Sequence, residues 1–252
     1  MSVARRFIDA NVRASRASAV RWGFSSDKPL WAAFMERTRR AIGDLDPGAT
    51  VLDLGAGRRS AYAGYIEPGS GVRLVAVDIS PEELAANTDV SETRVADVSK
   101  DLPFDDGSVD LVLSRALLEH VDGVPQAVRN MRRVLKPGGQ AIHLVPCRYS
   151  LFGTAARALP LGPSLTLLHA LDPDTKGKVE FPTVYDHCYP SALRQVFREA
   201  GFREVDLTIC WGQPGYFEFF LPVFLLTSLY ERFVERRVVE DAASYVIVHA
   251  WA

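Results

Sequence analysis

Three aspartates follow short apolar runs along the chain and are the residues best suited to chemistry. Asp53 comes after Val51-Leu52, Asp78 after a β-branched run, and Asp97 after Val95-Ala96. A carboxylate accepts hydrogen bonds from ammonium groups, hydroxyls and amines, and it repels phosphate. Each aspartate alone is as readily a turn or cap residue, but three of them after successive runs predict a binding site.

A glycine turn, Gly55-Ala56-Gly57, follows Asp53 and lets the backbone approach a ligand closely. Dinucleotide sites also have such a turn, so the turn alone does not identify the ligand. Their third fingerprint position is Gly or Ala, whereas this chain has Ser60. Asp53 would also repel a pyrophosphate and attract an ammonium group. S-adenosylmethionine, which has an amino-acid moiety and no phosphate, fits this pattern better than NAD(P).

The spacing of the other two aspartates fits the rest of that cofactor. Asp78 lies 21 residues after Gly57, a spacing at which a carboxylate accepts from both ribose hydroxyls. Asp97 is placed to accept a hydrogen bond from the adenine amine, and the Val98 N–H is placed to donate one to a ring nitrogen of adenine.

The elements that position these residues are predicted by a regular alternation. Short β-branched runs alternate with helix-like segments from Thr50 onward, which is typical of a parallel α/β sheet. Strands are expected at 50–54, 73–78, 93–96, 109–114, 140–146, 204–210 and 244–251. Helices are expected at 123–135, before Lys136-Pro137-Gly138-Gly139, and at 191–200, before Gly201.

The block from Val51 to Pro146 resembles the class I S-adenosylmethionine-dependent methyltransferases, in particular the group with LPF, DLV, LEHV and RVLKPGG motifs. Those motifs are present as Leu102-Pro103-Phe104, Asp110-Leu111-Val112, Leu118-Glu119-His120-Val121 and Arg133-Val134-Leu135-Lys136-Pro137-Gly138-Gly139. The resemblance implies an α/β fold with a Rossmann-like seven-stranded sheet. Its strand order would be 3-2-1-4-5-7-6, with strand seven antiparallel, helices on both faces and added lid segments.

The resemblance also implies contacts for individual residues. Asp53, Gly55, Ala56 and Gly57 correspond to the methionine end, Asp78 and Ile79 to the ribose, Asp97 and Val98 to the adenine, and Ser114 and Arg115 to the surroundings of the sulfonium. One departure follows the glycine turn, where Arg58-Arg59-Ser60 replaces the small residue of many relatives. Arg58 is expected to pair with the methionine carboxylate; the alternative is an ordinary solvated arginine.

A single methyltransferase domain over 1–252 is expected, with three segments beyond the minimal scheme. Residues 1–49 are interpreted as an N-terminal helical cap, and 148–186 with 212–241 as insertions that form an acceptor-side lid. The alternative is that they only cover the faces of the sheet. Within the last segment, aromatic residues are dense over 216–230, which predicts a lid, a peripheral membrane contact or a homodimer contact.

The chemistry expected is O-methylation of a small molecule, glycan or lipid acceptor. Methyl transfer from a sulfonium needs alignment and exclusion of water, and it needs a base only when the nucleophile must lose a proton. Ser114-Arg115-Ala116-Leu117 stands where amino or carbon methyltransferases have Asn-Pro-Pro-Tyr-like or Pro-Cys motifs. His187 is the expected catalytic base and Tyr185 the next candidate; the alternative is a loop histidine without function. His120 is expected to border the cofactor pocket.

The composition argues against several other classes of protein. A net charge of −2 gives no attraction to nucleic acid. Cys147, Cys188 and Cys210 form no CxxC pair, which argues against a disulfide framework and against a metal site and favours the cytoplasm. The N-terminal stretch has no apolar signal sequence, with an Arg-rich transit peptide as the alternative. The rival functions are a non-catalytic S-adenosylmethionine-binding or scaffold protein and an NAD(P)-dependent oxidoreductase.

Overall fold

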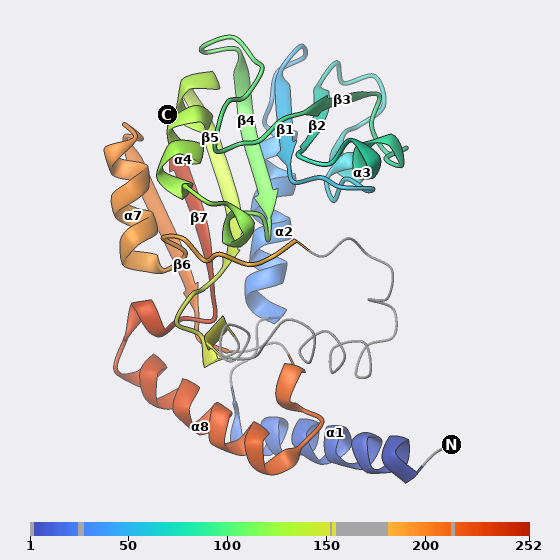
Figure 1. Cartoon of the computed structure of the whole chain (residues 1–252), viewed down its shortest axis with the longest axis vertical. Coiled ribbons are helices and arrows are strands. Elements are labelled where there is room, and N and C mark those ends of the chain that lie inside the picture. The colour runs from blue at the N-terminus through green and yellow to red at the C-terminus, as the bar shows by residue number, and fades with distance from the viewer. Residues whose placement is uncertain (1–2, 25–27, 152, 155–180, 213–214) are drawn as a thin grey trace.

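A seven-stranded sheet forms the centre of the computed structural model, which describes residues 3–24, 28–151, 153–154, 181–212 and 215–252 (Figure 1). The strands are β1 (Thr50–Leu54), β2 (Arg73–Asp78), β3 (Glu92–Val95), β4 (Val109–Arg115), β5 (Leu135–Pro146), β6 (Glu204–Cys210) and β7 (Tyr245–Trp251). Their order is β3-β2-β1-β4-β5-β7-β6, and β7 runs antiparallel to both of its neighbours. The predicted fold class and strand order are therefore confirmed.

Strand β5 begins earlier than the sequence predicts. The Lys-Pro-Gly-Gly segment was expected only to end a helix, and β5 was expected to start at Gln140. Instead Leu135 already pairs with Val109, and the register then shifts so that Gln140 pairs with Leu111. Gly138 has a φ of 81° and donates its N–H to the Ala252 carbonyl, so the glycines form an irregularity inside the strand.

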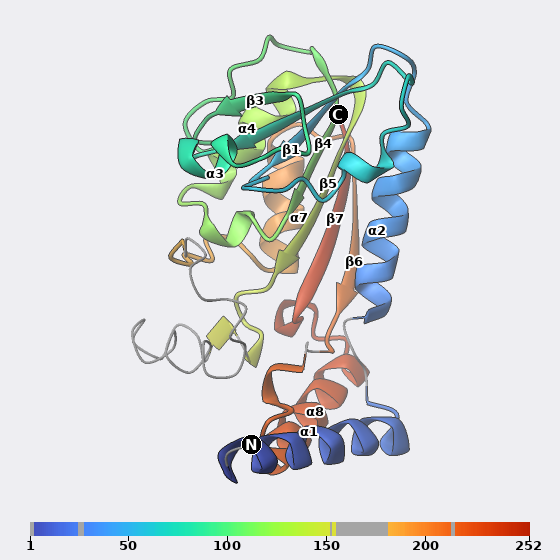
Figure 2. The same ribbon diagram turned by 90° about the vertical axis from the view of Figure 1, so that its right-hand side faces the viewer.

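Alternating apolar side chains bury both faces of the sheet. On one face, α2 (Lys28–Gly43) packs Leu30, Phe34 and Ile42 against a cluster that includes Val51 and Leu113. On the other face lie α4 (Val124–Val134) and α7 (Pro190–Glu199), which share a second cluster with the intervening strand residues (Figure 2). The short helix α3 (Pro81–Ala85) lies between β2 and β3.

A separate pair of helices lies beyond the carboxyl ends of the parallel strands (Figures 1 and 2). It consists of α1 (Val3–Trp22) and α8 (Leu221–Arg236), which are far apart in the sequence. The Leu221 N–H donates to Asn11 Oδ1 at 3.0 Å and Arg232 donates to the Trp22 carbonyl at 3.0 Å, so the helices run in the same direction. The expected N-terminal cap thus divides into two parts: α2 covers the sheet, and α1 packs on α8.

Short 3-10 turns complete the connections: η1 (Ala63–Tyr65), η2 (Leu118–His120), η4 (Gly215–Phe217) and η5 (Glu240–Ala242). Much of the expected lid segment 148–186 falls outside the described residues. In the part of the chain that is described, no helix combines the length and apolar character that crossing a membrane requires.

Candidate functional site

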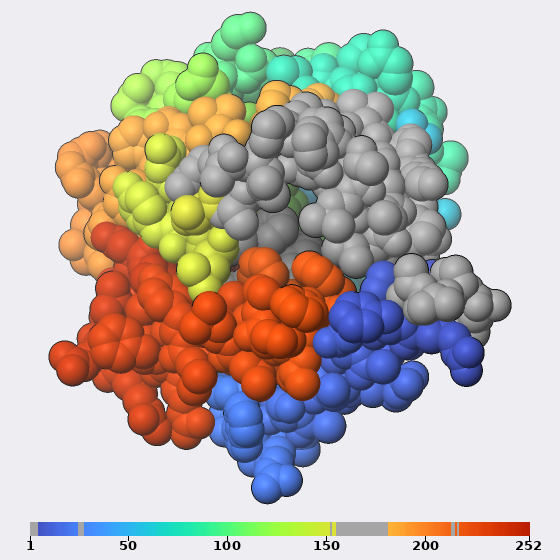
Figure 3. Space-filling view, turned by 60° about the horizontal axis from the view of Figure 1, so that its bottom comes forward, coloured from blue at the N-terminus to red at the C-terminus, as the bar shows by residue number. Residues whose placement is uncertain are grey.

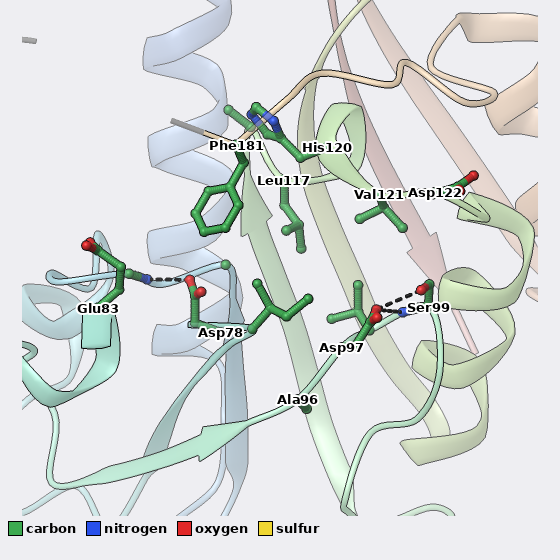
Figure 4. A pocket seen from close by; sticks show the side chains of 15 residues that line it. Asp78, Glu83, Ala96, Asp97, Ser99, Leu117, His120, Val121, Asp122 and Phe181 are labelled. Carbon is green, nitrogen blue, oxygen red and sulfur yellow. Dashed lines mark hydrogen bonds between the residues drawn. The ribbon is translucent and has the colours of Figure 1, made fainter. Parts of the chain in front are cut away.

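A cavity of about 400 Å³ opens at the carboxyl edge of the sheet (Figure 4). Its wall is built from the segments that follow β1, β2, β3 and β4, which this topology brings together at one edge. The described lining residues are Gly55, Gly57, Asp78, Ile79, Glu83, Ala96, Asp97, Val98, Ser99, Ala116, Leu117, His120, Val121, Asp122 and Phe181. Six of the predicted cofactor residues therefore lie in one wall.

The glycine turn after β1 needs its glycines. Gly55 and Gly57 have φ angles of 71° and 54°, a region that side chains disfavour. A Cβ on Gly55 would lie 2.9 Å from Leu117 Cδ1, so Leu117 closes over the turn. Leu117 reaches this position because Ala116, just after β4, also has a positive φ of 54°.

Asp78 is fixed at the end of β2 by two backbone hydrogen bonds. Its Oδ2 accepts from the Gly57 N–H at 2.9 Å, the dashed line at Asp78 in Figure 4. Its Oδ1 accepts from the Ser80 N–H at 3.0 Å. Ser80 in turn caps α3, because its side chain accepts from the Glu83 N–H. The carboxylate is thereby held in the cavity wall, where its remaining lone pairs can accept from a bound hydroxyl.

Asp97 and Val98 line the same wall after β3. Asp97 Oδ1 accepts from the Ser99 N–H at 3.0 Å and from the Ser99 hydroxyl at 2.7 Å. These bonds, opposed by partial burial, lower the pKa of Asp97, so its side chain is ionised at neutral pH. The Val98 carbonyl accepts from Asn130 at 2.9 Å, which anchors the segment to α4.

The wall is acidic. It contains four carboxyl groups, those of Asp78, Glu83, Asp97 and Asp122, and no Lys or Arg among its described residues. Two cations pair with wall carboxylates: the Arg58 guanidinium with Glu83 at 2.9 Å and Lys100 Nζ with Asp97 at 3.4 Å. Such a wall favours a ligand with positive charge and hydroxyl donors and disfavours a pyrophosphate.

Asp53 lies one residue before the end of β1 and is not among the described lining residues of the cavity. The side chain is 4% exposed and accepts a hydrogen bond from the Ser60 hydroxyl at 2.6 Å. Burial raises the pKa of Asp53 to about 7, against the opposing effects of the Ser60 hydrogen bond and of Arg115. Asp53 therefore changes charge near neutral pH.

The other predicted cofactor residues are placed differently. Ala56 is buried in the turn, and Arg58 is engaged by Glu83. Ser114 is fully buried and bonds His143 Nδ1 at 2.8 Å. Arg115 is exposed at the end of β4, with its guanidinium 6.0 Å from the Trp31 ring centre.

His120 borders the cavity, as its motif predicted, with both ring nitrogens near protein atoms. Its Nδ1 lies 3.2 Å from the Pro182 carbonyl and its Nε2 lies 3.7 Å from Glu119 Oε1. Burial lowers the pKa of His120, while burial raises the pKa of Glu119 to about 8. This pair is therefore neutral near pH 7.

His187 and Tyr185, the predicted catalytic residues, are not among the described residues of the cavity wall. His187 Nδ1 lies 2.6 Å from Asp186 Oδ1, and Asp186 Oδ2 accepts from the Val124 N–H at the start of α4. Tyr185 is 2% exposed and belongs to the core. Both have positive φ, 52° and 55°, in a tight loop before α7.

Eight wall residues were not predicted as site residues: Glu83, Ala96, Ser99, Ala116, Leu117, Val121, Asp122 and Phe181. Ser99 has a local signal, because a serine two residues after an aspartate forms an Asx turn. Phe181 has none, since it reaches the wall only through the tertiary fold. No cluster of His, Cys, Asp and Glu suited to a metal ion occurs in the described portion of the chain.

Comparisons with known proteins agree with this geometry. Residues 52–143 match a family model described as a methyltransferase domain. A demethylmenaquinone methyltransferase of Mycolicibacterium gilvum is 38% identical over 46% of this chain and 49% of its own length. The chain thus spans about half the length of the curated relatives that it matches first.

Two solved structures are similar in fold. One is the geranyl diphosphate C-methyltransferase of Streptomyces coelicolor A3(2), in complex with Mg²⁺, geranyl diphosphate and S-adenosyl-L-homocysteine. It has a TM-score of 0.53 and 16% identity, covering 89% of this chain and 81% of that one. The other is the [4+2]-cyclase SpnF, with a TM-score of 0.53 and 19% identity over 85% of this chain and 80% of that one.

Proposed function

Because this chain belongs to the class I S-adenosylmethionine-dependent methyltransferase family, we propose that it transfers a methyl group from S-adenosylmethionine to a small apolar acceptor. The observation that carries the proposal is the cavity wall, which joins a glycine turn to four carboxyl groups and contains no described cation. S-adenosylmethionine is cationic at its sulfonium and ammonium groups and carries no phosphate, so its charge complements this wall.

The residues present fit this cofactor. Gly55 and Gly57 would let the backbone approach the cofactor closely. Asp78 would bind the ribose hydroxyls, and Asp97 with Val98 would bind the adenine edge. When bound, the cofactor supplies a methyl group already activated by the sulfonium charge. What the chain must add is alignment of the acceptor and exclusion of water. Leu117, Val121 and Phe181 line the cavity with apolar surface suited to that task.

The acceptor class is inferred from the apolar side chains that line the cavity beside its carboxyl groups. The family model ends at His143, before the segments that were interpreted as the acceptor-side lid. Several curated relatives are named demethylmenaquinone methyltransferases, and a quinone is a small, apolar, cyclic acceptor. We therefore place apolar ring compounds ahead of glycans among the acceptors.

For a hydroxyl acceptor, His187 would remove the proton. The Asp186 carboxylate accepts from Nδ1, which leaves Nε2 as the nitrogen that can take a proton. The loop is held by Tyr185, which is buried, and by the Asp186 bond to the start of α4. A ring carbon is the second candidate for the methylated atom, because several curated relatives are named for demethylmenaquinone, a ring compound.

A non-catalytic role is the main rival. The similarity to a cyclase shows that this fold also occurs in a protein named for a different reaction. An NAD(P)-dependent oxidoreductase is disfavoured by the acidic wall, which would repel a pyrophosphate.

The test is methyl transfer itself. The protein is incubated with S-adenosylmethionine labelled at its methyl group and with a panel of phenols, reduced naphthoquinones and glycans. Label should enter an apolar ring compound, and mass spectrometry of the product distinguishes an O-methyl from a C-methyl group. Binding of the cofactor with no transfer to any of these acceptors, and preferential transfer to a glycan, would both contradict the proposal.

A further inference from the structure

The helix pair α1–α8 carries an apolar surface that faces solvent. On α8, Leu226 is 70% exposed, Leu229 54% and Phe233 56%, a spacing that places them along one side of the helix. On α1, Val20 is 87% exposed and Trp22 45%. Figure 3, turned so that this end faces the viewer, shows both helices at the surface.

The exposed side chains Leu226, Leu229 and Phe233 lie on the side of α8 opposite to the side that packs on the protein. Ser228, Glu231 and Val234 are buried. Phe224 meets Phe24, just beyond α1, with ring centres 6.2 Å apart. The helix is therefore already anchored by its inner side, and the exposed leucines and phenylalanine are not needed for that packing.

The same pair of helices is basic, although the whole chain has a net charge of −2. Residues 3–24 and 215–239 contain eight arginines and only four acidic residues. Two of the acids are already paired, Asp9 with Arg5 and Glu218 with Arg16, and Glu231 is buried. Arg6, Arg13 and Arg21 are all exposed on α1.

We propose that the α1–α8 surface docks this protein on anionic lipid bilayers. Exposed Leu, Phe and Trp side chains beside a surplus of arginines are the composition of helices that lie in a membrane interface. The charge argues against self-association through this face, because two copies would bring like-charged arginines together. The inference is independent of the proposed methyl transfer, since it concerns binding alone.

The placement of the α1–α8 surface also suits contact with a membrane. The helix pair lies beyond the carboxyl edge of the sheet, the edge at which the cavity opens (Figures 1 and 4). A bilayer held by α1 and α8 is therefore on the cavity's end of the molecule. That arrangement suits a ligand that resides in lipid.

The experiment is co-sedimentation of the full chain with vesicles. One set is phosphatidylcholine alone, and the other is phosphatidylcholine and phosphatidylglycerol in equal parts. We expect binding to the anionic set, weak binding to the neutral set, and loss of binding as salt screens the arginines. Equal binding to both sets, or binding to neither, overturns the proposal.

Two variants test the two components separately. Leu226→Gln with Phe233→Gln should reduce the partition coefficient about tenfold or more, because two large side chains no longer enter the bilayer. Arg6→Gln with Arg13→Gln should reduce it by about fivefold per arginine on anionic vesicles only. The matched control is Arg198→Gln with Arg203→Gln, two exposed arginines near the amino edge of β6, which should bind like the wild type.

Circular dichroism shows whether each variant folds, which these exposed positions should permit. Sedimentation velocity supplies the remaining arm of the test. If the wild type is a dimer that Leu226→Gln with Phe233→Gln converts to a monomer, the surface belongs to a second copy and the lipid assignment is wrong.

Discussion

The Ser60 hydroxyl donates a 2.6 Å hydrogen bond to the carboxylate of Asp53, which is otherwise buried just before the glycine turn. Burial raises the pKa of Asp53, and this bond opposes that effect. In the sequence, Ser60 is a mismatch to the dinucleotide fingerprint. The structure gives it a positive role, which is to favour the charged form of Asp53.

Replacing Ser60 by Ala should therefore weaken cofactor binding without unfolding the protein. The substitution removes a hydrogen bond to a charged group, which contributes ~1.5–3 kcal/mol, so S-adenosylmethionine affinity at pH 7 should fall about tenfold. Isothermal titration calorimetry measures the change, and Ser60→Thr, which keeps the hydroxyl, is the matched control. Unchanged affinity in the alanine variant would show that this bond does not act on the cofactor.

Cofactor affinity should also depend on pH through Asp53. Its pKa is about 7, so the carboxylate that attracts an ammonium group is lost as the pH falls below that value. Affinity should be constant above about pH 8 and fall by up to about tenfold per pH unit below pH 7. A flat profile between pH 5.5 and 8.5 would contradict the methionine-end role of Asp53.

The raised pKa of Asp53 also predicts that the unliganded protein becomes less stable as the pH rises. This dependence on pH is opposite to that expected for cofactor affinity. The folded protein binds the Asp53 proton more tightly than the unfolded chain does, since the pKa is raised from 3.8 to about 7. The free energy of unfolding of the unliganded protein should therefore fall as the pH rises between those values. Asp53→Asn should raise Tm at pH 8 by at least ~2 °C, the shift that about 1 kcal/mol produces at this size. A lower Tm in this variant, measured by calorimetry, would refute the cost assigned to the buried charge.

The two histidines can be separated by substitution. His187→Ala should lower turnover on a hydroxyl acceptor by about 10²–10⁴-fold while cofactor affinity stays within about threefold, because the change removes a base and no cofactor contact. His120→Ala, in the cavity wall, should alter cofactor affinity instead. If His187→Ala leaves turnover unchanged and His120→Ala abolishes it, the base has been assigned to the wrong loop.

The fold and the cofactor wall could be predicted because their signals are local. Asp78 and Asp97 each end an apolar run, and a parallel sheet brings the ends of such runs to one edge whatever the loops do. The contact of Leu117 with Gly55 depends on a positive φ at Ala116. An alanine in the sequence does not indicate a positive φ. The pairing of α1 with α8 joins residues about 210 positions apart, and no short-range pattern encodes such a contact. For the same reason the sequence did not reveal that Arg58 meets Glu83.

Asp78→Asn is the sharpest test of a single wall residue. The amide keeps the shape and one acceptor oxygen but removes the charge that holds the Gly57 N–H and would accept the ribose hydroxyls. Affinity for S-adenosylmethionine should fall at least about tenfold, since a hydrogen bond to a charged group contributes ~1.5–3 kcal/mol. Asp105→Asn, an exposed carboxyl outside the described wall, is the control.

Competitive calorimetry on the wild type shows whether the acidic cavity selects a cationic, phosphate-free cofactor. S-adenosylmethionine and NAD⁺ are titrated into the same protein at pH 8, where Asp53 is ionised. We expect binding of S-adenosylmethionine in the micromolar range and binding of NAD⁺ at least about a hundredfold weaker, because the pyrophosphate meets the wall's carboxylates. Tight binding of NAD⁺ with no heat from S-adenosylmethionine would contradict it.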